Sequence, residues 1–162
     1  MTTAVEPGYG GPHDPDHARD EVLAAAAACV RAFGAHDTAD YFACFHPAAT
    51  FLFHTTDRLL GSREAYEAEW ASWEAEGFRV LGCTSTEQQV DVWGDVAVLS
   101  HRVRTEVRPA EGAEPEVQHE RETIVFARQA DGGWLGVHEH LSPDPAQRNE
   151  PDAPPPPPLA AG

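Results

Sequence analysis

The chain has 162 residues, of which 41% are hydrophobic, and this is enough for one domain with a buried core. Its 27 acidic against 11 basic residues give a formal net charge of -16, which would repel phosphate backbones and anionic lipid headgroups. We therefore expect neither nucleic acid nor a membrane as partner. The first residues lack the basic region and apolar run of a secretory signal, and we expect a cytoplasmic protein.

Composition divides the chain into three segments. Residues 1–18 are rich in glycine, proline and acids, and residues 146–162 contain a run of five prolines. Neither segment can bury enough apolar surface to offset the entropy of ordering, so both are predicted to be disordered tails. Residues 19–145 are predicted to form the domain.

Helical periodicity dominates the first half of this domain. A helix is predicted from about Arg19 to Gly34, and a short second helix from about residue 37, stopped by Pro47. Residues 49–56 follow as a strand. A third helix begins after Ser62, a suitable N-cap, and carries Tyr66, Trp70 and Trp73 as one apolar stripe.

Strands dominate from residue 78 onward. Residues 78–93 predict a long strand bent around Gly82, and Gly94-Asp95 predicts a tight turn. Further strands are predicted at residues 96–107, 117–128 and 134–143. Helices gathered on one face of an antiparallel sheet make an α+β domain.

Two stretches carry a family resemblance. "DYFACFHPAATFLF", from residue 40, and "RETIVFARQADGGWLGVHEHLSP", from residue 121, resemble the nuclear transport factor 2-like superfamily, specifically its SnoaL-like members, over residues 19–145. The ending is also similar to the association domain of calcium/calmodulin-dependent protein kinase II. The resemblance implies a cone-shaped, curled antiparallel sheet, with helices packed on its concave face around a pocket, and a homodimer formed through the sheet.

Strand alternation predicts which side chains reach such a pocket. His101, Glu122 and Glu139 lie on three different strands, each in a row of mainly apolar residues, and are the candidate catalytic groups. An apolar setting raises the pKa of a carboxyl toward neutrality, where histidine also titrates, so these groups could exchange protons with an apolar carbonyl-containing metabolite. The predicted pocket wall consists of Phe51, Phe53, Trp70, Trp73, Val103, Ile124, Phe126, Val137 and Leu141.

The superfamily includes isomerases, cyclases, dehydratases, epoxide hydrolases and proteins without catalytic activity. Ketosteroid isomerases carry a base near the end of the first strand, and the position of this chain that resembles it is Phe53. The position of their oxyanion-binding acid matches Ile124. Since neither side chain can transfer a proton, we do not expect that specific isomerase activity, whereas a cyclase, dehydratase or other isomerase type remains open.

A non-catalytic function is the alternative. His101 could be a core histidine with a satisfied hydrogen bond, and the two glutamates could pair with arginines such as Arg102, Arg104 or Arg121 on neighbouring strands. The protein would then be a ligand-binding or dimerisation module.

His138 and His140 share the opposite face of the last strand from Glu139. They could pack in a dimer interface or chelate a metal, with His54, His119 or a carboxylate as a third ligand. No phosphate-binding glycine loop or dinucleotide fingerprint is present, and we expect no cofactor. The orientation of the last strand, residues 134–143, decides whether Glu139 or the two histidines line the pocket.

Overall fold

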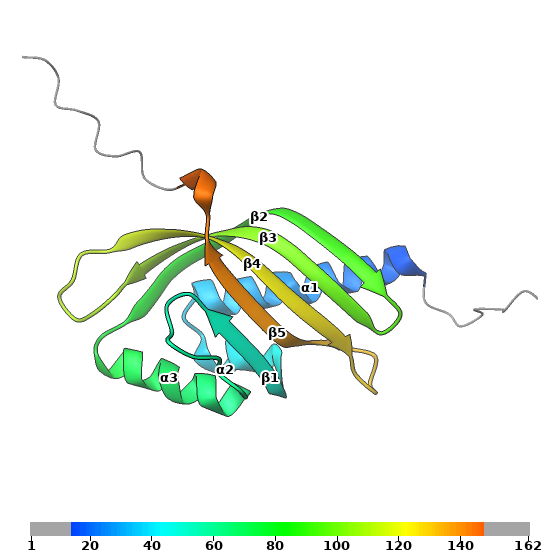
Figure 1. The fold of residues 1–162 in the computed structure, drawn as a ribbon, viewed down its shortest axis with the longest axis horizontal. Coiled ribbons are helices and arrows are strands. Elements are labelled where there is room, and N and C mark those ends of the chain that lie inside the picture. Colours follow the sequence, from blue (N-terminus) through cyan, green and yellow to red (C-terminus); the bar gives the residue numbers. More distant parts are fainter. Residues whose placement is uncertain (1–13, 148–162) are drawn as a thin grey trace, which may run out of the picture.

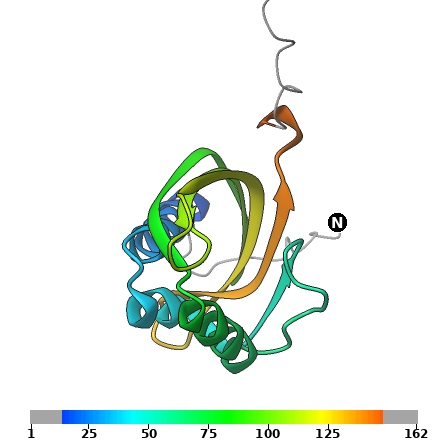
Figure 2. The ribbon, with the colours of Figure 1, turned by 90° about the vertical axis from the view of Figure 1, so that its left-hand side faces the viewer.

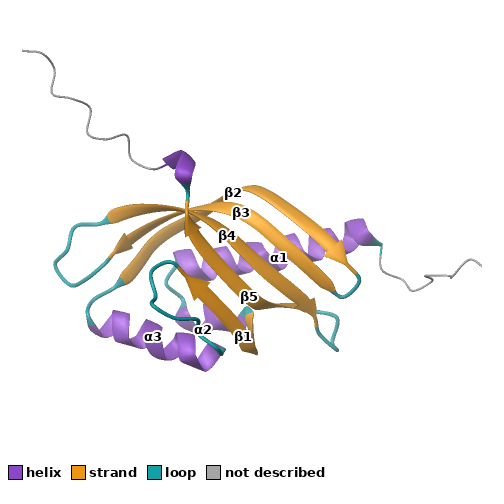
Figure 3. Ribbon diagram, in the orientation of Figure 1, coloured by secondary structure: helices purple, strands orange, loops and turns teal. Residues whose placement is uncertain are grey.

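The computed structural model describes residues 14–147, which form three helices and a five-stranded sheet (Figures 1 and 3). In chain order, the elements are α1 (Pro15–Gly34), α2 (Thr38–Ala43), β1 (Phe45–Phe53), α3 (Arg63–Ala75), β2 (Arg79–Trp93), β3 (Val96–Arg108), β4 (Glu116–Arg128), β5 (Trp134–Pro143) and a final turn of 3-10 helix, Pro145–Gln147. This order confirms the predicted α+β class.

The sheet has the strand order β1-β5-β4-β3-β2. The pairs from β2 to β5 are antiparallel, as predicted, whereas β1 runs parallel to β5. Figure 2 shows the sheet curling strongly around the interior. The bend at Gly82 is confirmed, because the β2–β3 register shifts between Val80 and Gly82, and again between Thr86 and Gln89.

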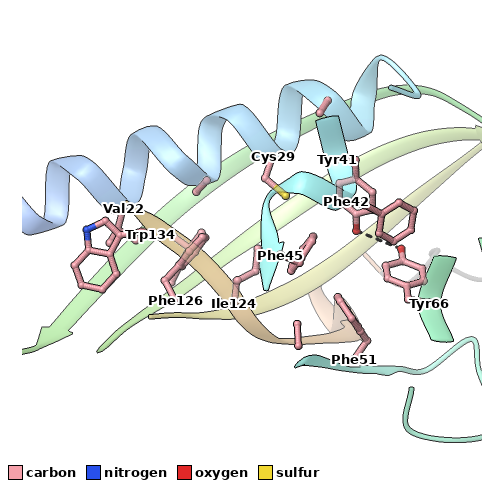
Figure 4. Packing of buried hydrophobic residues seen from close by; sticks show 14 of the residues in the cluster. Val22, Cys29, Tyr41, Phe42, Phe45, Phe51, Tyr66, Ile124, Phe126 and Trp134 are labelled. Atoms are coloured by element: carbon pink, nitrogen blue, oxygen red, sulfur yellow. Dashed lines mark hydrogen bonds between the residues drawn. The ribbon is translucent and has the colours of Figure 1, made fainter. Parts of the chain in front are cut away.

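Helix α1 packs against the concave face of the sheet. It buries Ala18, Val22, Ala26 and Cys29 at helical spacing, and these small side chains allow the helix axis to approach the strands closely. Figure 4 shows this helix above core residues of β4 and β5. No helix within residues 14–147 is both long and apolar enough to cross a membrane.

Helix α1 begins four residues before the predicted start. Asp14 is its N-cap and accepts a hydrogen bond from the backbone N–H of Asp16, and Pro15 occupies the first helical position, which tolerates proline. The rest of the predicted N-terminal tail, and the C-terminal tail from residue 148, lie outside the described residues.

Pro47 was predicted to end α2, but in the structure it lies inside β1. The helix already stops at Ala43, and the strand begins at Phe45 rather than Ala49. Strand β1 is at the edge of the sheet, where a residue without a backbone N–H is tolerated. The register of β1 against β5 shifts between Phe45 and Thr50, around this proline.

A β-bulge interrupts β5 next to the site described below. Val125 pairs with His138 and Phe126 with Gly136, so Val137 is an extra residue. The predicted alternation, which put Val137 and Leu141 on the same face as Glu139, is therefore broken. Trp134 and Gly136 are buried before the bulge, and Glu139 is buried after it.

Gly136 is the tightest point of this strand. A Cβ atom there would lie 2.7 Å from Cδ1 and 2.8 Å from Cε1 of Phe45, whose ring is 1% exposed. We predict that Gly136→Ala lowers the free energy of unfolding by about 1–3 kcal/mol, because the buried ring must move. Urea denaturation tests this, with Gly82→Ala as control, because its added Cβ would meet nothing within 4 Å. Equal losses in the two variants would contradict the packing explanation.

Candidate active site

Two adjoining cavities lie between the concave face of the sheet and the helices. The outer cavity has a volume of about 230 Å³ and the inner cavity about 40 Å³. Five residues line both: Phe33, Tyr66, Thr105, Glu120 and Leu141. The cavities thus form one pocket with a wide outer part and a narrow inner end.

Glu139 and Glu122 lie side by side at the inner end. Glu139 is 2% exposed and follows the bulge in β5, and the register places it opposite Ile124, two residues from Glu122 on β4. Burial raises the pKa of Glu139 well above its usual value, and the negative charge of Glu122 raises it further. The raised pKa favours the neutral form of Glu139, which can donate a hydrogen bond to Glu122.

His101 is the side chain that contacts Glu122. The two residues pair across β3 and β4, with Nε2 of His101 against Oε2 of Glu122. Nδ1 of His101 lies 2.6 Å from Oγ of Ser85 on β2, which fixes the ring. Burial favours a higher pKa for Glu122, but the contact with His101 outweighs it and holds the pKa below its usual value. Glu122 is thus ionised beside a neutral Glu139.

The arginine pairing considered above for the two glutamates is absent from residues 14–147. Arg102 instead contacts Glu87 and Asp144, and neither Arg104 nor Arg121 forms an ion pair in this part of the chain. Leaving a carboxyl in this cavity without a cation is tolerable only because Glu139 is protonated.

Two tyrosines from the helices complete the inner end. The hydroxyl of Tyr41 on α2 donates to Oε2 of Glu139 at 3.5 Å, and it lies 3.2 Å from the hydroxyl of Tyr66 on α3 (Figure 4). Burial, with the nearby Glu139, raises the pKa of both phenols well above 10, so both remain hydrogen-bond donors. From the sequence, Tyr66 was predicted only as part of an apolar helix stripe, and Tyr41 was not predicted as a site residue. A buried tyrosine hydroxyl needs a polar partner, and this requirement is the feature that could have revealed them.

Glu120 lies at the junction of the two cavities. Its Oε1 is 2.6 Å from Nε2 of His54, which follows β1. Burial raises the pKa of Glu120, and the contact with His54 partly offsets this effect. His54 is thus engaged by a carboxylate rather than available beside His138 and His140.

The structure brings most of the predicted wall to the pocket, but not all of it. Phe53, Trp70, Trp73 and Leu141 line the outer cavity, and Val103, Ile124 and Leu141 line the inner one. Phe51 and Phe126 are core residues with 0% and 1% exposure that line neither cavity, and Val137 in the bulge also lines neither. The outer cavity gains Phe33 and Phe78, which were not predicted.

His138 and His140 lie on the convex face of the sheet, away from the pocket. Nδ1 of His138 is 2.8 Å from Oγ1 of Thr50, and His140 is exposed. No group of three or more His, Cys, Asp or Glu side chains within residues 14–147 is arranged to hold a metal ion. Glu139, not the histidine pair, therefore faces the pocket.

The cysteine thiols are poorly suited to act as nucleophiles in this pocket. All three cysteines, Cys29, Cys44 and Cys83, are free. Cys29 and Cys83 line the inner cavity, and burial raises the pKa of Cys83 to about 11. A hydrogen bond with Cys44, followed by burial, raises the pKa of Cys29. Both thiols remain protonated, so the chemistry of the inner end is that of carboxyl, imidazole and phenol groups.

The protonated state of Glu139 predicts a pH-dependent stability. Between its unfolded pKa near 4.5 and its raised folded pKa, the folded chain binds more protons than the unfolded chain, so stability falls as pH rises. Glu139→Gln removes this loss. We predict that the stability of the variant relative to wild type increases from about pH 5 to about pH 8, by up to about 1.4 kcal/mol per pH unit. Urea denaturation at several pH values measures this.

The control for this prediction is Glu114→Gln, an exposed carboxyl in the β3–β4 loop, which should show no such trend. A constant difference between Glu139→Gln and wild type across the pH range would show that Glu139 is ionised in the folded protein.

Comparisons with known proteins agree with this architecture. Residues 22–146 match the family model of the SnoaL-like domain. No curated protein matches the chain.

Several solved structures share the fold at low sequence identity. A nuclear transport factor 2-like superfamily protein from Salmonella enterica is 16% identical, with a TM-score of 0.70 over 86% of this chain and 99% of that one. A ketosteroid isomerase-like protein from Erwinia carotovora is 14% identical, with a TM-score of 0.66 over 76% of this chain and 94% of that one. A putative calcium/calmodulin-dependent protein kinase II association domain from Xanthomonas campestris is 17% identical, with a TM-score of 0.59 over 90% and 96%. Because the family match spans most of the sequence, the chain belongs to the SnoaL-like domain family and has the nuclear transport factor 2-like fold.

Proposed function

We propose that this protein binds a small, mainly apolar carbonyl compound and catalyses proton transfer on it, as an isomerase, cyclase or dehydratase. The observation that carries the proposal is the position of Glu122 and Glu139 at the inner end of one pocket, with His101, which lines neither cavity, in contact with Glu122. A neutral carboxylic acid beside an ionised carboxylate supplies an acid and a base within reach of the same ligand atoms.

The roles of the two carboxyls follow from their protonation states. Glu139, which Tyr41 contacts and orients, donates a hydrogen bond in its neutral form to the carbonyl oxygen, where negative charge develops on enolisation. Glu122 in its ionised form removes the proton from the adjacent carbon, and the contact with His101 orients it. Returning that proton to another carbon gives isomerisation. Loss of a β-hydroxyl, which takes up a proton as water, gives dehydration, and attack of the enolate on a second carbonyl gives cyclisation.

The dimensions of the pocket restrict how a ligand enters it. By volume the inner cavity holds roughly three water molecules, so only the reacting end of a ligand fits there. The outer cavity, with its aromatic wall, accommodates the remainder. Phe53 and Ile124, at the positions matched above to the two acidic groups of ketosteroid isomerases, line the outer and the inner part and cannot transfer protons. The proposed groups instead lie at other positions, on β3, β4 and β5.

Hydrogen exchange into a ketone tests this proposal without knowledge of the natural substrate. Cyclohexanone and the larger 2-indanone are incubated with the protein in deuterated buffer, and loss of the α-proton signal is followed by NMR. We expect the wild type to accelerate exchange. Glu139→Gln and Glu122→Gln should each lower the enzymatic rate by about 10²–10⁴-fold, because each removes one proton-transfer group. Circular dichroism confirms that the variants are folded.

The matched control for exchange is again Glu114→Gln, which should retain the wild-type rate. An unchanged rate in Glu139→Gln would remove this residue from the mechanism. Binding of both ketones without any exchange would favour the alternative, a non-catalytic ligand-binding module in which the His101–Glu122 pair only joins β3 to β4.

The proposal includes a homodimer formed through the convex face of the sheet. No helix within residues 14–147 covers this face, and apolar side chains lie on it, among them Val98, Val125 and Leu52, the last 40% exposed. His138 and His140 share the same face and would pack in the interface. The proposal keeps the cytoplasmic location expected from the sequence, which the three free cysteines support.

We predict that Val125→Arg weakens this dimer, because it places a charge in the centre of the proposed interface. Sedimentation velocity should show a shift from dimer to monomer at equal concentration. Ala68→Arg, on the exposed surface of α3, is the control and should leave the oligomeric state unchanged. A wild-type monomer, or a Val125→Arg variant that remains dimeric, would contradict an interface at this position.

A further inference from the structure

Apart from thiols and phenols, the ionisable groups that line the pocket are all carboxyls. Glu76 and Glu120 line the outer cavity, and Glu120, Glu122 and Glu139 line the inner one. No arginine or histidine is among the lining residues of either cavity in the described part of the chain, and the sequence contains no lysine. Within this partly enclosed space, a ligand anion would meet Glu120 and Glu122 directly, whereas their partners His54 and His101 line neither cavity. The pocket therefore disfavours anions and favours neutral or cationic ligands.

Aromatic rings form a large part of the wall of the outer cavity. Six of the fourteen residues that line the outer cavity are aromatic: Phe33, Phe53, Tyr66, Trp70, Trp73 and Phe78. The ring centroid of Phe78 lies 5.5 Å from that of Trp70, with an interplanar angle of 85°, and 5.9 Å from that of Trp73, with an angle of 67°. Because the π face of an aromatic ring attracts cations, with tryptophan the strongest, aromatic cages bind substituted ammonium groups.

Glu120 provides a negative group at the junction of the two cavities. Its Oε1 contacts His54, whereas its Oε2 has no hydrogen-bond partner within residues 14–147. Glu120 is 8% exposed, yet it lines both cavities. A carboxylate oxygen in such a position gains a charge-assisted partner when an ammonium group enters the outer cavity.

We propose that the ligand carries a cationic nitrogen, as a substituted amine or quaternary ammonium group, which is held in the outer cavity by Glu120 and the aromatic wall. Its uncharged carbonyl end would then point toward Glu122 and Glu139. This inference rests on the proposed function in placing the ligand in the same pocket, but it concerns recognition and does not require turnover.

Three probes of nearly equal shape test the charge preference. Choline carries a trimethylammonium group, its carbon isostere carries a neutral tert-butyl group on the same alcohol, and tert-butylacetic acid carries that group on a carboxylate. Binding is followed by tryptophan fluorescence and by NMR shifts of the indole N–H groups, at a slightly basic pH that keeps Glu120 ionised. We expect choline to bind about ten-fold or more tightly than its neutral isostere, and the carboxylate to bind most weakly.

Two variants locate the preference. In Glu120→Gln, the ratio of choline to isostere affinity should fall toward one, whereas in Glu114→Gln it should stay at the wild-type value. Trp73→Leu should weaken choline more than the isostere, since leucine keeps apolar contact but lacks a π face. This second variant tests the same site if Glu120→Gln does not fold.

Glu139→Gln separates this inference from the proposed catalysis, because it should retain the choline preference while losing ketone exchange. Three results would overturn the inference: equal or tighter binding of the neutral isostere, preference for the carboxylate, or absence of choline binding to the wild type. A full choline preference in folded Glu120→Gln would overturn the role of that residue. Absence of ketone exchange in the wild type, with the choline preference intact, would overturn only the proposed catalysis.

Discussion

The burial of three ionisable groups at the narrow end of the pocket is the constraint on which the rest of this site depends. Two neighbouring carboxylates and one imidazolium would leave a net negative charge with little water to solvate it. Burial beside Glu122 raises the pKa of Glu139 and so favours its neutral form, while the pKa of Glu122, which contacts His101, is lowered. One proton thus makes the cluster compatible with folding, and the same proton supplies the acid of the proposed chemistry.

The surrounding elements hold the groups of this cluster in position. The bulge at Val137 turns β5 so that Glu139 faces inward beside Glu122, although Gly136 before it also faces inward to accommodate the ring of Phe45. Tyr41 hydrogen-bonds Glu139 from the helical layer. Ser85, on the long bent strand β2, fixes the other side of the His101 ring. Each of these contacts joins segments far apart in the sequence, so the site exists only after the sheet has curled and the helices have packed against it.

The pocket divides recognition from chemistry along its length. Polar groups capable of proton transfer gather at the inner end, where the available volume is small. The wider outer part contains aromatic side chains from α1, β1 and α3, together with Phe78 just before β2. Since the nuclear transport factor 2-like fold hosts many functions, the reaction and the ligand must be inferred from these side chains rather than from the fold.

Much of the fold, and part of the site, could be predicted from the sequence because the relevant information is local. Alternation along β3 placed His101 among buried residues, and the pattern of β4 placed Glu122 on the same side as Ile124 and Phe126. The bulge in β5 could not be predicted, because the extra residue in this strand depends on its pairing with β4 and on the close packing of Gly136 against Phe45. Neither contact is local in the sequence. Alternation therefore placed Glu139 correctly but Val137 wrongly.

The sequence by itself determined the order of the elements, the amphipathic faces of the helices and the strongly acidic character of the chain, since each of these follows from residue types at fixed spacing. Only the tertiary structure decided that His101, rather than an arginine, is the partner of Glu122, and that Tyr41 reaches Glu139. It also decided that His54 pairs with Glu120 and that the pair of histidines lies outside the pocket. The physical reason is that pairing and protonation depend on distances and burial created by sheet curvature, and no local spacing contains that curvature.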